Sequence, residues 1–155
     1  MTFDQALDKV IALEGGYILE RNPTESADTY AGIYRKVFPS WAGWSYIDKG
    51  LVPPKELVAS HYREEFWDKA QCADPVAQYL LFEFGVNAGN SKARMIATAV
   101  NPDYKTITQP SDVREFVLSF TIGRIKHYTD LANRNPKRYG IYLRGWINRA
   151  LEAIA

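Results

Sequence analysis

The first fourteen residues constrain the fold most, because they form an amphipathic stretch with a marked beginning and end. Thr2 and Gln5 have the spacing of a capping box. Apolar residues then recur at helical spacing, at Phe3, Leu7, Val10 and Ile11. Gly15-Gly16 ends the pattern. A helix over about residues 3–14 has one apolar face that other elements must cover, which predicts a globular, helix-rich protein.

Prolines, glycines and capping residues divide the rest of the chain. Residues 15–34 are typical of a loop or short β-ribbon, with a possible strand at 17–19, and residues 38–54 of a structured loop. Further helices are expected over 55–70, from Asp74-Pro75 to near Gly89, from Ser91 to before Asn101, from Ser111 to before Pro136, and over 137–154. The sequence shows no repeat or linker. It predicts an α+β, predominantly α-helical chain, with residues 1–155 as a single domain and a small β-ribbon after helix 1.

Charge is distributed unevenly along the 155 residues, although the net charge is only +1. Residues 1–30 hold six acidic and two basic residues, whereas residues 121–155 hold seven basic and two acidic residues. Arg134, Lys137 and Arg138 cluster where the last two helices should meet. A near-neutral whole argues against nucleic acid as a partner, and the basic end favours an anionic one.

Several other classes of protein are excluded by composition. Cys72 is the only cysteine, so no intramolecular disulfide forms. His61 and His127 are isolated, so we expect no metal site and no cofactor. No signal peptide and no membrane-spanning run is found. We expect synthesis in the host cytoplasm, no stable membrane insertion, and release to the periplasm or cell wall by another factor.

Glu14 is the most informative anomaly, because it occupies the next position of the apolar stripe of helix 1. A carboxyl there lies on the buried face, at the carbonyl end of the helix. Burial and the helix dipole both disfavour its charged form, so we expect it to be largely buried and protonated near neutral pH. Such a carboxyl can act as a general acid. The alternative is an exposed glutamate at a frayed helix end.

Two segments carry a family resemblance. Glu14-Gly15-Gly16-Tyr17 and Thr29-Tyr30-Ala31-Gly32-Ile33 resemble glycoside hydrolase family 108, lysozyme-like muramidases found in phage endolysins and bacterial genomes. Later matches follow in order: Tyr62-Arg63 with Phe66-Trp67, Phe82-Glu83-Phe84 with Asn87-Ala88-Gly89, Arg124 with Tyr128, and Gly145-Trp146-Ile147-Asn148-Arg149. Together they span nearly the whole chain.

The resemblance implies a lysozyme-like fold and a bacteriolytic enzyme, with bacterial peptidoglycan as partner. It implies cleavage of the β-1,4 bond between N-acetylmuramic acid and N-acetylglucosamine, with Glu14 as the catalytic acid. Tyr17, Tyr30 and Asn87 lie in the matched segments and are expected to contact the substrate. We expect the protein to act as a monomer.

The second catalytic group is less clear from the sequence. Family members commonly carry Asp-Pro-Gly-Gly between the glutamate and the threonine, but residues 21–28 contain no glycine. Glu20, Glu25 and Asp28 are candidates for the second carboxylate. An inverting mechanism needs a base or water-positioning group about 6.5–9.5 Å from the acid. Asp28 and Thr29, beside the matched segment, are favoured.

Glu83 and Trp44 each admit two interpretations. Glu83 lies on an apolar helical stripe, and could line the substrate site or pair in the interior with Arg124 or Arg149. Trp44 lies in the structured loop expected over residues 38–54, which is rich in aromatic residues. Indole rings there could stack on sugar faces or could pack in the hydrophobic interior. Both residues are predicted here to bind substrate.

Other functions remain open on the sequence alone. A lytic transglycosylase would use the same acid and release a 1,6-anhydro product. A wall-binding module could keep the fold without the second carboxylate, and the altered segment 21–28 favours that reading. A helical nucleic-acid binder would use the basic end, but the near-neutral net charge argues against it.

Overall fold

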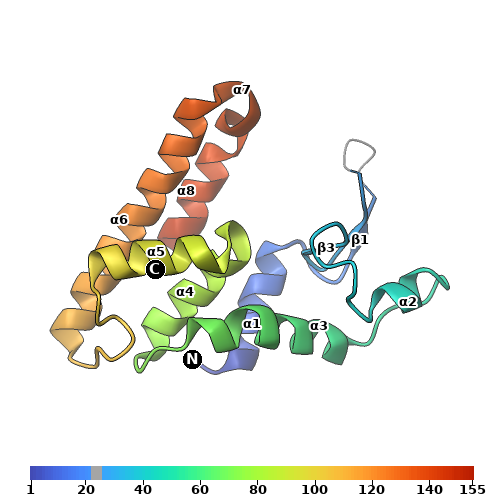
Figure 1. Ribbon diagram of the computed structural model, residues 1–155, viewed down its shortest axis with the longest axis horizontal. Helices are drawn as coiled ribbons and strands as arrows, with labels where there is room; N and C mark the ends of the chain where they lie inside the picture. Colours follow the sequence, from blue (N-terminus) through green and yellow to red (C-terminus); the bar gives the residue numbers. More distant parts are fainter. Residues whose placement is uncertain (22–25) are drawn as a thin grey trace. The chain divides into compact units, whose positions relative to one another are not determined.

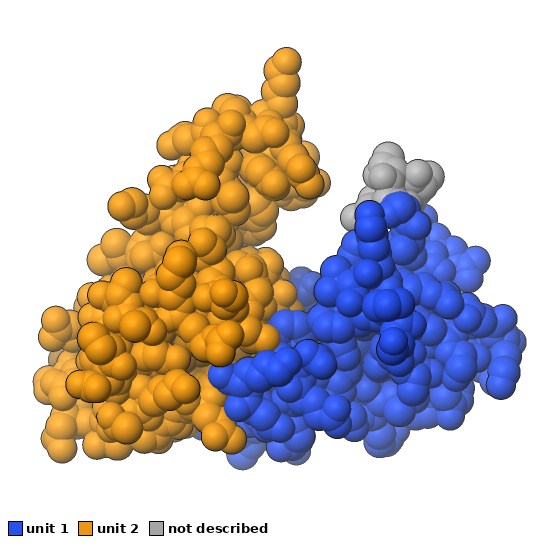
Figure 2. Space-filling view, in the orientation of Figure 1, with its two compact units in different colours: residues 1–69 blue, residues 70–155 orange. Residues whose placement is uncertain are grey.

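The computed structural model describes residues 1–21 and 26–155 and is mostly helical, with a small antiparallel sheet after the first helix (Figure 1). This confirms the predicted α+β, predominantly helical class. The chain forms two compact units, Met1–Lys69 and Ala70–Ala155 (Figure 2), which are described separately. The organisation of residues 1–155 as a single domain stays a prediction.

Helix α1, Phe3–Leu13, opens the first unit as expected. Gln5 N donates to the Thr2 side chain and the Gln5 side chain accepts from Thr2 N, which completes the capping box. The buried residues of the helix are Phe3, Ala6, Leu7, Val10 and Ile11. Glu14 is the C-cap, and Gly15 and Gly16 follow with φ of 88° and 91°. These left-handed conformations explain why glycines end the helix.

The sheet contains three two-residue strands, β1 (Leu19–Glu20), β2 (Thr29–Tyr30) and β3 (Ile33–Tyr34), in the order β1-β2-β3. Leu19 pairs with Tyr30, and Glu20 pairs with Thr29. Between β2 and β3, Ala31 and Gly32 have φ of 48° and 78°, as a two-residue hairpin turn requires. The strand predicted at 17–19 starts two residues later, because Ile18 N is used in a turn to Gly16 O.

The remainder of the first unit contains α2 (Trp44–Ile47), inside the predicted structured loop, and α3 (Lys55–Tyr62). A π-helical turn, Arg63–Trp67, and a 3-10 turn, Asp68–Ala70, continue α3. The expected helix over 55–70 is therefore present, but its winding changes after Tyr62.

The second unit contains α4 (Pro75–Ala88), α5 (Asn90–Val100), α6 (Pro110–Arg134), α7 (Pro136–Tyr139) and α8 (Leu143–Glu152). As predicted, Asp74 caps α4, and its carboxylate accepts from Val76 N and Ala77 N. The single helix expected over 137–154 is wrong: α7 and a 3-10 turn, Gly140–Tyr142, precede α8. In Figure 1, α7 lies at one end of the α6–α8 pair.

Candidate active site

The side chain of Glu14 packs directly beneath the hairpin turn between β2 and β3. A Cβ added to Gly32 would lie 2.8 Å from Glu14 Cγ and 2.5 Å from the Tyr62 hydroxyl oxygen. That hydroxyl donates a hydrogen bond of 2.8 Å to Ala31 O. Glu14, Ala31, Gly32 and Tyr62 therefore form one close-packed group, named here the Glu14 cluster. A side chain at position 32 would push these groups apart.

Glu14 is partly buried, less completely than the stripe residues Phe3, Leu7 and Val10. The helix ends at Leu13, and Glu14 itself takes a C-cap conformation with ψ near 7°. The stripe Phe3, Leu7, Val10 is buried, but position 14 leaves it where the chain turns into Gly15. A partly exposed carboxyl beside a glycine turn is accessible to a ligand.

Among the candidates for the second group, the described geometry brings Glu20 and Thr29 together. They are direct partners in the β1–β2 ladder, so their side chains lie on the same sheet face. Glu20 Oε1 lies 3.6 Å from a Cβ built on Gly15, the residue after Glu14. The carboxylate of Asp28 is paired with a cation, since its Oδ1 lies 3.8 Å from Arg21 Nε. Glu25 lies outside the described residues.

Two aromatic residues predicted to contact sugar have little surface to offer. Tyr30 is buried and stacks on Trp41, with ring centroids 5.9 Å apart. Trp44 is buried too, and its indole N–H donates to Phe38 O at 2.8 Å. Both rings take part in packing within the first unit, and their contact with substrate stays a prediction. Tyr17 is only partly buried, and Lys55 Nζ lies 4.7 Å from its ring centroid.

The first unit also contains a groove of about 470 Å³ between residues 37–42 and α3. Phe38, Trp41 and His61 are among the residues that line it. The imidazole of His61 meets Phe38 edge-on at 4.4 Å between centroids. Burial lowers the pKa of His61 to about 4, so the ring is uncharged near neutral pH. The crowding of aromatic residues is the one feature of the sequence that points to this groove.

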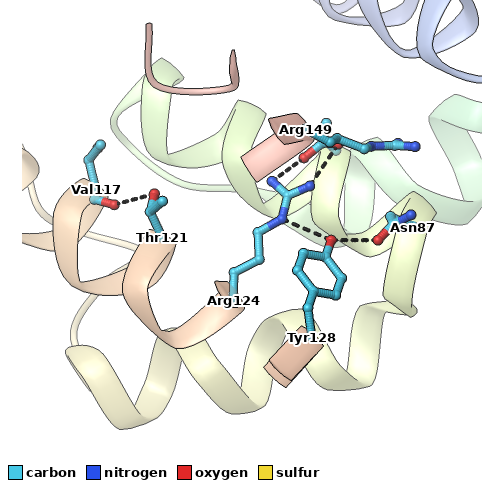
Figure 3. Close-up of polar contacts among 7 residues, drawn as sticks. Asn87, Val117, Thr121, Arg124, Tyr128 and Arg149 are labelled. Carbon is cyan, nitrogen blue, oxygen red and sulfur yellow. Dashed lines mark hydrogen bonds and ion pairs between the residues drawn. The ribbon is translucent and has the colours of Figure 1, made fainter. Parts of the chain in front are cut away.

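In the second unit, Glu83 is the centre of a buried ionic network. Figure 3 labels its two partners, Arg124 and Arg149. The Glu83 carboxylate forms ion pairs with Arg124 and Arg149, and Arg124 Nη2 donates to Glu83 Oε1 at 3.0 Å. Arg124 Nε donates to the Tyr128 hydroxyl at 3.0 Å, and that hydroxyl donates to the amide oxygen of Asn87.

Glu83 is 0% exposed and Arg124 is 1% exposed, so both charged groups lie in the interior of the second unit. These ion pairs favour the alternative interpretation of Glu83, a buried partner of arginine, and its contact with substrate stays a prediction. The predicted contact at Asn87 is also engaged within the protein, because its amide oxygen accepts from Tyr128. Burial raises the pKa of the Tyr128 hydroxyl, which keeps it a proton donor to Asn87.

A comparison with protein families matches residues 7–89 to glycosyl hydrolase 108, over half of the chain. The chain belongs to glycosyl hydrolase family 108. No curated protein and no solved structure matches it. The family match contains the whole Glu14 cluster, the sheet, and Glu83 at its far end.

Membership of family 108 fixes the class of chemistry as glycosidic bond hydrolysis, with a polysaccharide as substrate. Carboxyl groups carry out that chemistry in most glycosidases. Among the described residues, no group of His, Cys, Asp and Glu side chains is arranged to hold a metal ion.

Proposed function

We propose that this family 108 chain is a peptidoglycan hydrolase of the muramidase type. It cleaves the β-1,4 bond between N-acetylmuramic acid and N-acetylglucosamine, with Glu14 as general acid. The observation that carries the proposal is the Glu14 cluster: a partly exposed carboxyl is held at the end of α1 by close packing against Gly32. Fixed placement of an acid at an open turn is what protonation of a glycosidic oxygen needs.

In the proposed reaction, Glu14 gives its proton to the glycosidic oxygen as the bond to the muramic acid C1 breaks. A water attacks C1 and loses a proton to a base, so the product keeps an ordinary reducing end. We assign Thr29 and Glu20 to hold this water, because they share one sheet face and Glu20 lies beside Gly15. Asp28 is the alternative base, although its carboxylate lies near Arg21.

The test of Glu14 is the change Glu14→Gln, which keeps the size of the side chain but removes the acidic proton. Lysis of purified peptidoglycan should fall at least about a hundredfold, since general acid catalysis contributes about 10²–10⁴ in rate. The thermal unfolding midpoint should stay near that of the wild type. Glu56→Gln, an exposed change on α3, is the matched control and should lyse normally. Retained lysis in Glu14→Gln would remove Glu14 from the mechanism.

The bond and the second group are tested by mass spectrometry of the digest. Muropeptides with reducing-end muramic acid are expected, whereas a dominant 1,6-anhydro product would mean that the enzyme is a transglycosylase. A chain that binds peptidoglycan but releases no fragments would be a wall-binding module. Glu20→Gln should reduce the rate more than Asp28→Asn does, and the reverse order would make Asp28 the base.

A further inference from the structure

The turn between α6 and α8 presents exposed apolar side chains within a cluster of basic ones. Ile141 is 76% exposed and Tyr142 is 52% exposed. The exposed basic residues around them are Arg134, Lys137, Arg138 and Arg144. The sequence holds no acidic residue between Asp130 and Glu152. Residues 134–144 are named here the α7 tip, and Figure 1 shows α7 at the end of the α6–α8 pair.

The α7 tip is held in place by aromatic packing. The Trp146 ring lies 6.1 Å from Tyr139, 5.6 Å from Tyr142 and 5.1 Å from Tyr128, measured between centroids. The Asn135 side chain caps α7 by accepting from Arg138 N at 3.1 Å. In the sequence, Ile141 lies between Tyr139 and Tyr142, two of the three tyrosines that pack on Trp146. The exposed side chain of Ile141 therefore belongs to a turn that is fixed by packing on both sides of it.

We propose that the α7 tip docks the protein on the surface of an anionic phospholipid membrane. The basic side chains match the negative headgroups, and Ile141 and Tyr142 enter the boundary between headgroups and acyl chains. A water-soluble polyanion would pair with the basic side chains but would leave Ile141 in water. The exposed apolar side chains of the α7 tip therefore favour a lipid surface. Basic residues around exposed apolar and aromatic ones are the composition of interfacial membrane anchors.

The contact is peripheral. No helix in the described parts of the chain has the length and apolar character needed to cross a bilayer. Because the overall net charge is only +1, the attraction comes from the local cluster and not from the protein as a whole. This inference goes beyond the proposed hydrolase activity and does not depend on it.

The experiment is co-sedimentation of the full chain with vesicles of phosphatidylglycerol or of phosphatidylcholine. The wild type should bind the anionic vesicles and bind phosphatidylcholine far less. Ile141→Ser should weaken binding about tenfold through lost apolar burial. The double change Lys137→Glu with Arg138→Glu should weaken it at least about 25-fold, since each basic residue near such a surface contributes about fivefold.

Matched controls come from the first unit. Val52→Ser removes another exposed apolar side chain, 79% exposed, and Lys36→Glu with Lys49→Glu makes the same charge change at exposed positions. Both controls should bind the anionic vesicles as the wild type does. Equal losses in the tip variants and the controls would overturn the proposal, because net charge or general apolarity would then explain binding.

Two further results would overturn it. One is wild-type binding that does not distinguish phosphatidylglycerol from phosphatidylcholine. The other is an equal loss, in the tip variants, of binding to lipid-free peptidoglycan, which would make the wall polymer the partner of the α7 tip. Hydrolysis of lipid-free peptidoglycan should be unchanged in Ile141→Ser. A wild type that hydrolyses nothing would count against the proposed function alone, since vesicle binding is measured without turnover.

Discussion

The change Gly32→Ala tests whether close packing of the Glu14 cluster is what positions the acid. Gly32 has a φ of 78°, a conformation that L residues rarely adopt. The added Cβ would approach the Tyr62 hydroxyl oxygen to 2.5 Å and Glu14 Cγ to 2.8 Å, both well inside normal contact. The Tyr62 hydroxyl donates to Ala31 O, so it is already held by the turn that the new methyl group would distort.

Two terms add in the expected loss of stability. The left-handed backbone costs an alanine about 1 kcal/mol relative to glycine. Overpacking by one methyl group adds about 1–3 kcal/mol. The free energy of unfolding should therefore fall by about 2–4 kcal/mol. Displacing Glu14 by about an ångström should lower the hydrolytic rate by about a hundredfold, since misplacement of a reacting group on this scale has effects of that size.

Gly50→Ala is the matched control. Gly50 has a similar φ of 72°, but a Cβ there meets nothing within 4 Å. Gly50→Ala should therefore lose only the stability that the left-handed backbone costs an alanine. Position 50 also lies apart from the Glu14 cluster in the chain. The assay is thermal unfolding with peptidoglycan hydrolysis at a temperature where both variants are folded. About 1 kcal/mol corresponds to about 2–4 °C in the midpoint for a chain of this size.

A Gly32→Ala protein that melts and hydrolyses like Gly50→Ala would refute the reasoning. It would mean that the turn, Tyr62 and Glu14 adjust freely to an added methyl group. The cluster would then have no part in placing the acid. A large loss of stability with full activity in the folded fraction would separate packing from catalysis and would contradict the positioning argument alone.

Two further predictions concern buried ionisable groups. Glu83→Ala should destabilise the protein by about 3–5 kcal/mol, because it leaves Arg124 and Arg149 without the carboxylate they share. The measurement is denaturant unfolding, with the exposed change Glu115→Ala as the control. Equal losses of stability in the two variants would contradict the buried network. Burial holds the pKa of His61 at about 4, below its usual 6.5, so between these values the unfolded chain binds a proton there and the folded chain does not. Stability from this group is therefore complete above pH 6.5 and is lost as the pH falls towards 4, by about 1–2 kcal/mol after allowing for partial exposure. His61→Gln should show a smaller loss between pH 7 and pH 5, and the same pH dependence in both proteins would contradict the assignment.

Local chemistry allowed much of the fold to be predicted. The capping box at Thr2 and the Asp74 cap before Pro75 both form as expected, because they depend only on residues within one helical turn. The glycines after Glu14 end α1 for an equally local reason, since the left-handed backbone they adopt is available to glycine.

Features that depend on residues far apart in the chain could not be predicted from the sequence. The turn at Ala31-Gly32 is shaped by Tyr62, which lies 31 residues beyond Ala31 and reaches it through a hydrogen bond. Trp44 looked like a sugar platform, and only the packed loop shows that its indole is buried and bonded to Phe38 O. The conformation of Glu14 as the C-cap depends on where α1 stops, and periodicity fixes that point only to within a residue or two.

The network around Glu83 also limits how this family 108 chain can change over evolution. The carboxylate lies 41 residues before one arginine and 66 before the other, on three separate helices. Replacing Glu83 alone by an apolar residue leaves two arginines without their carboxylate, although replacing all three residues together need not destabilise the fold. Loss of the acid is therefore tolerated only together with loss of the arginines. Relatives that lack the acid should lack both arginines, and recombination between relatives should succeed only where all three come from the same parent.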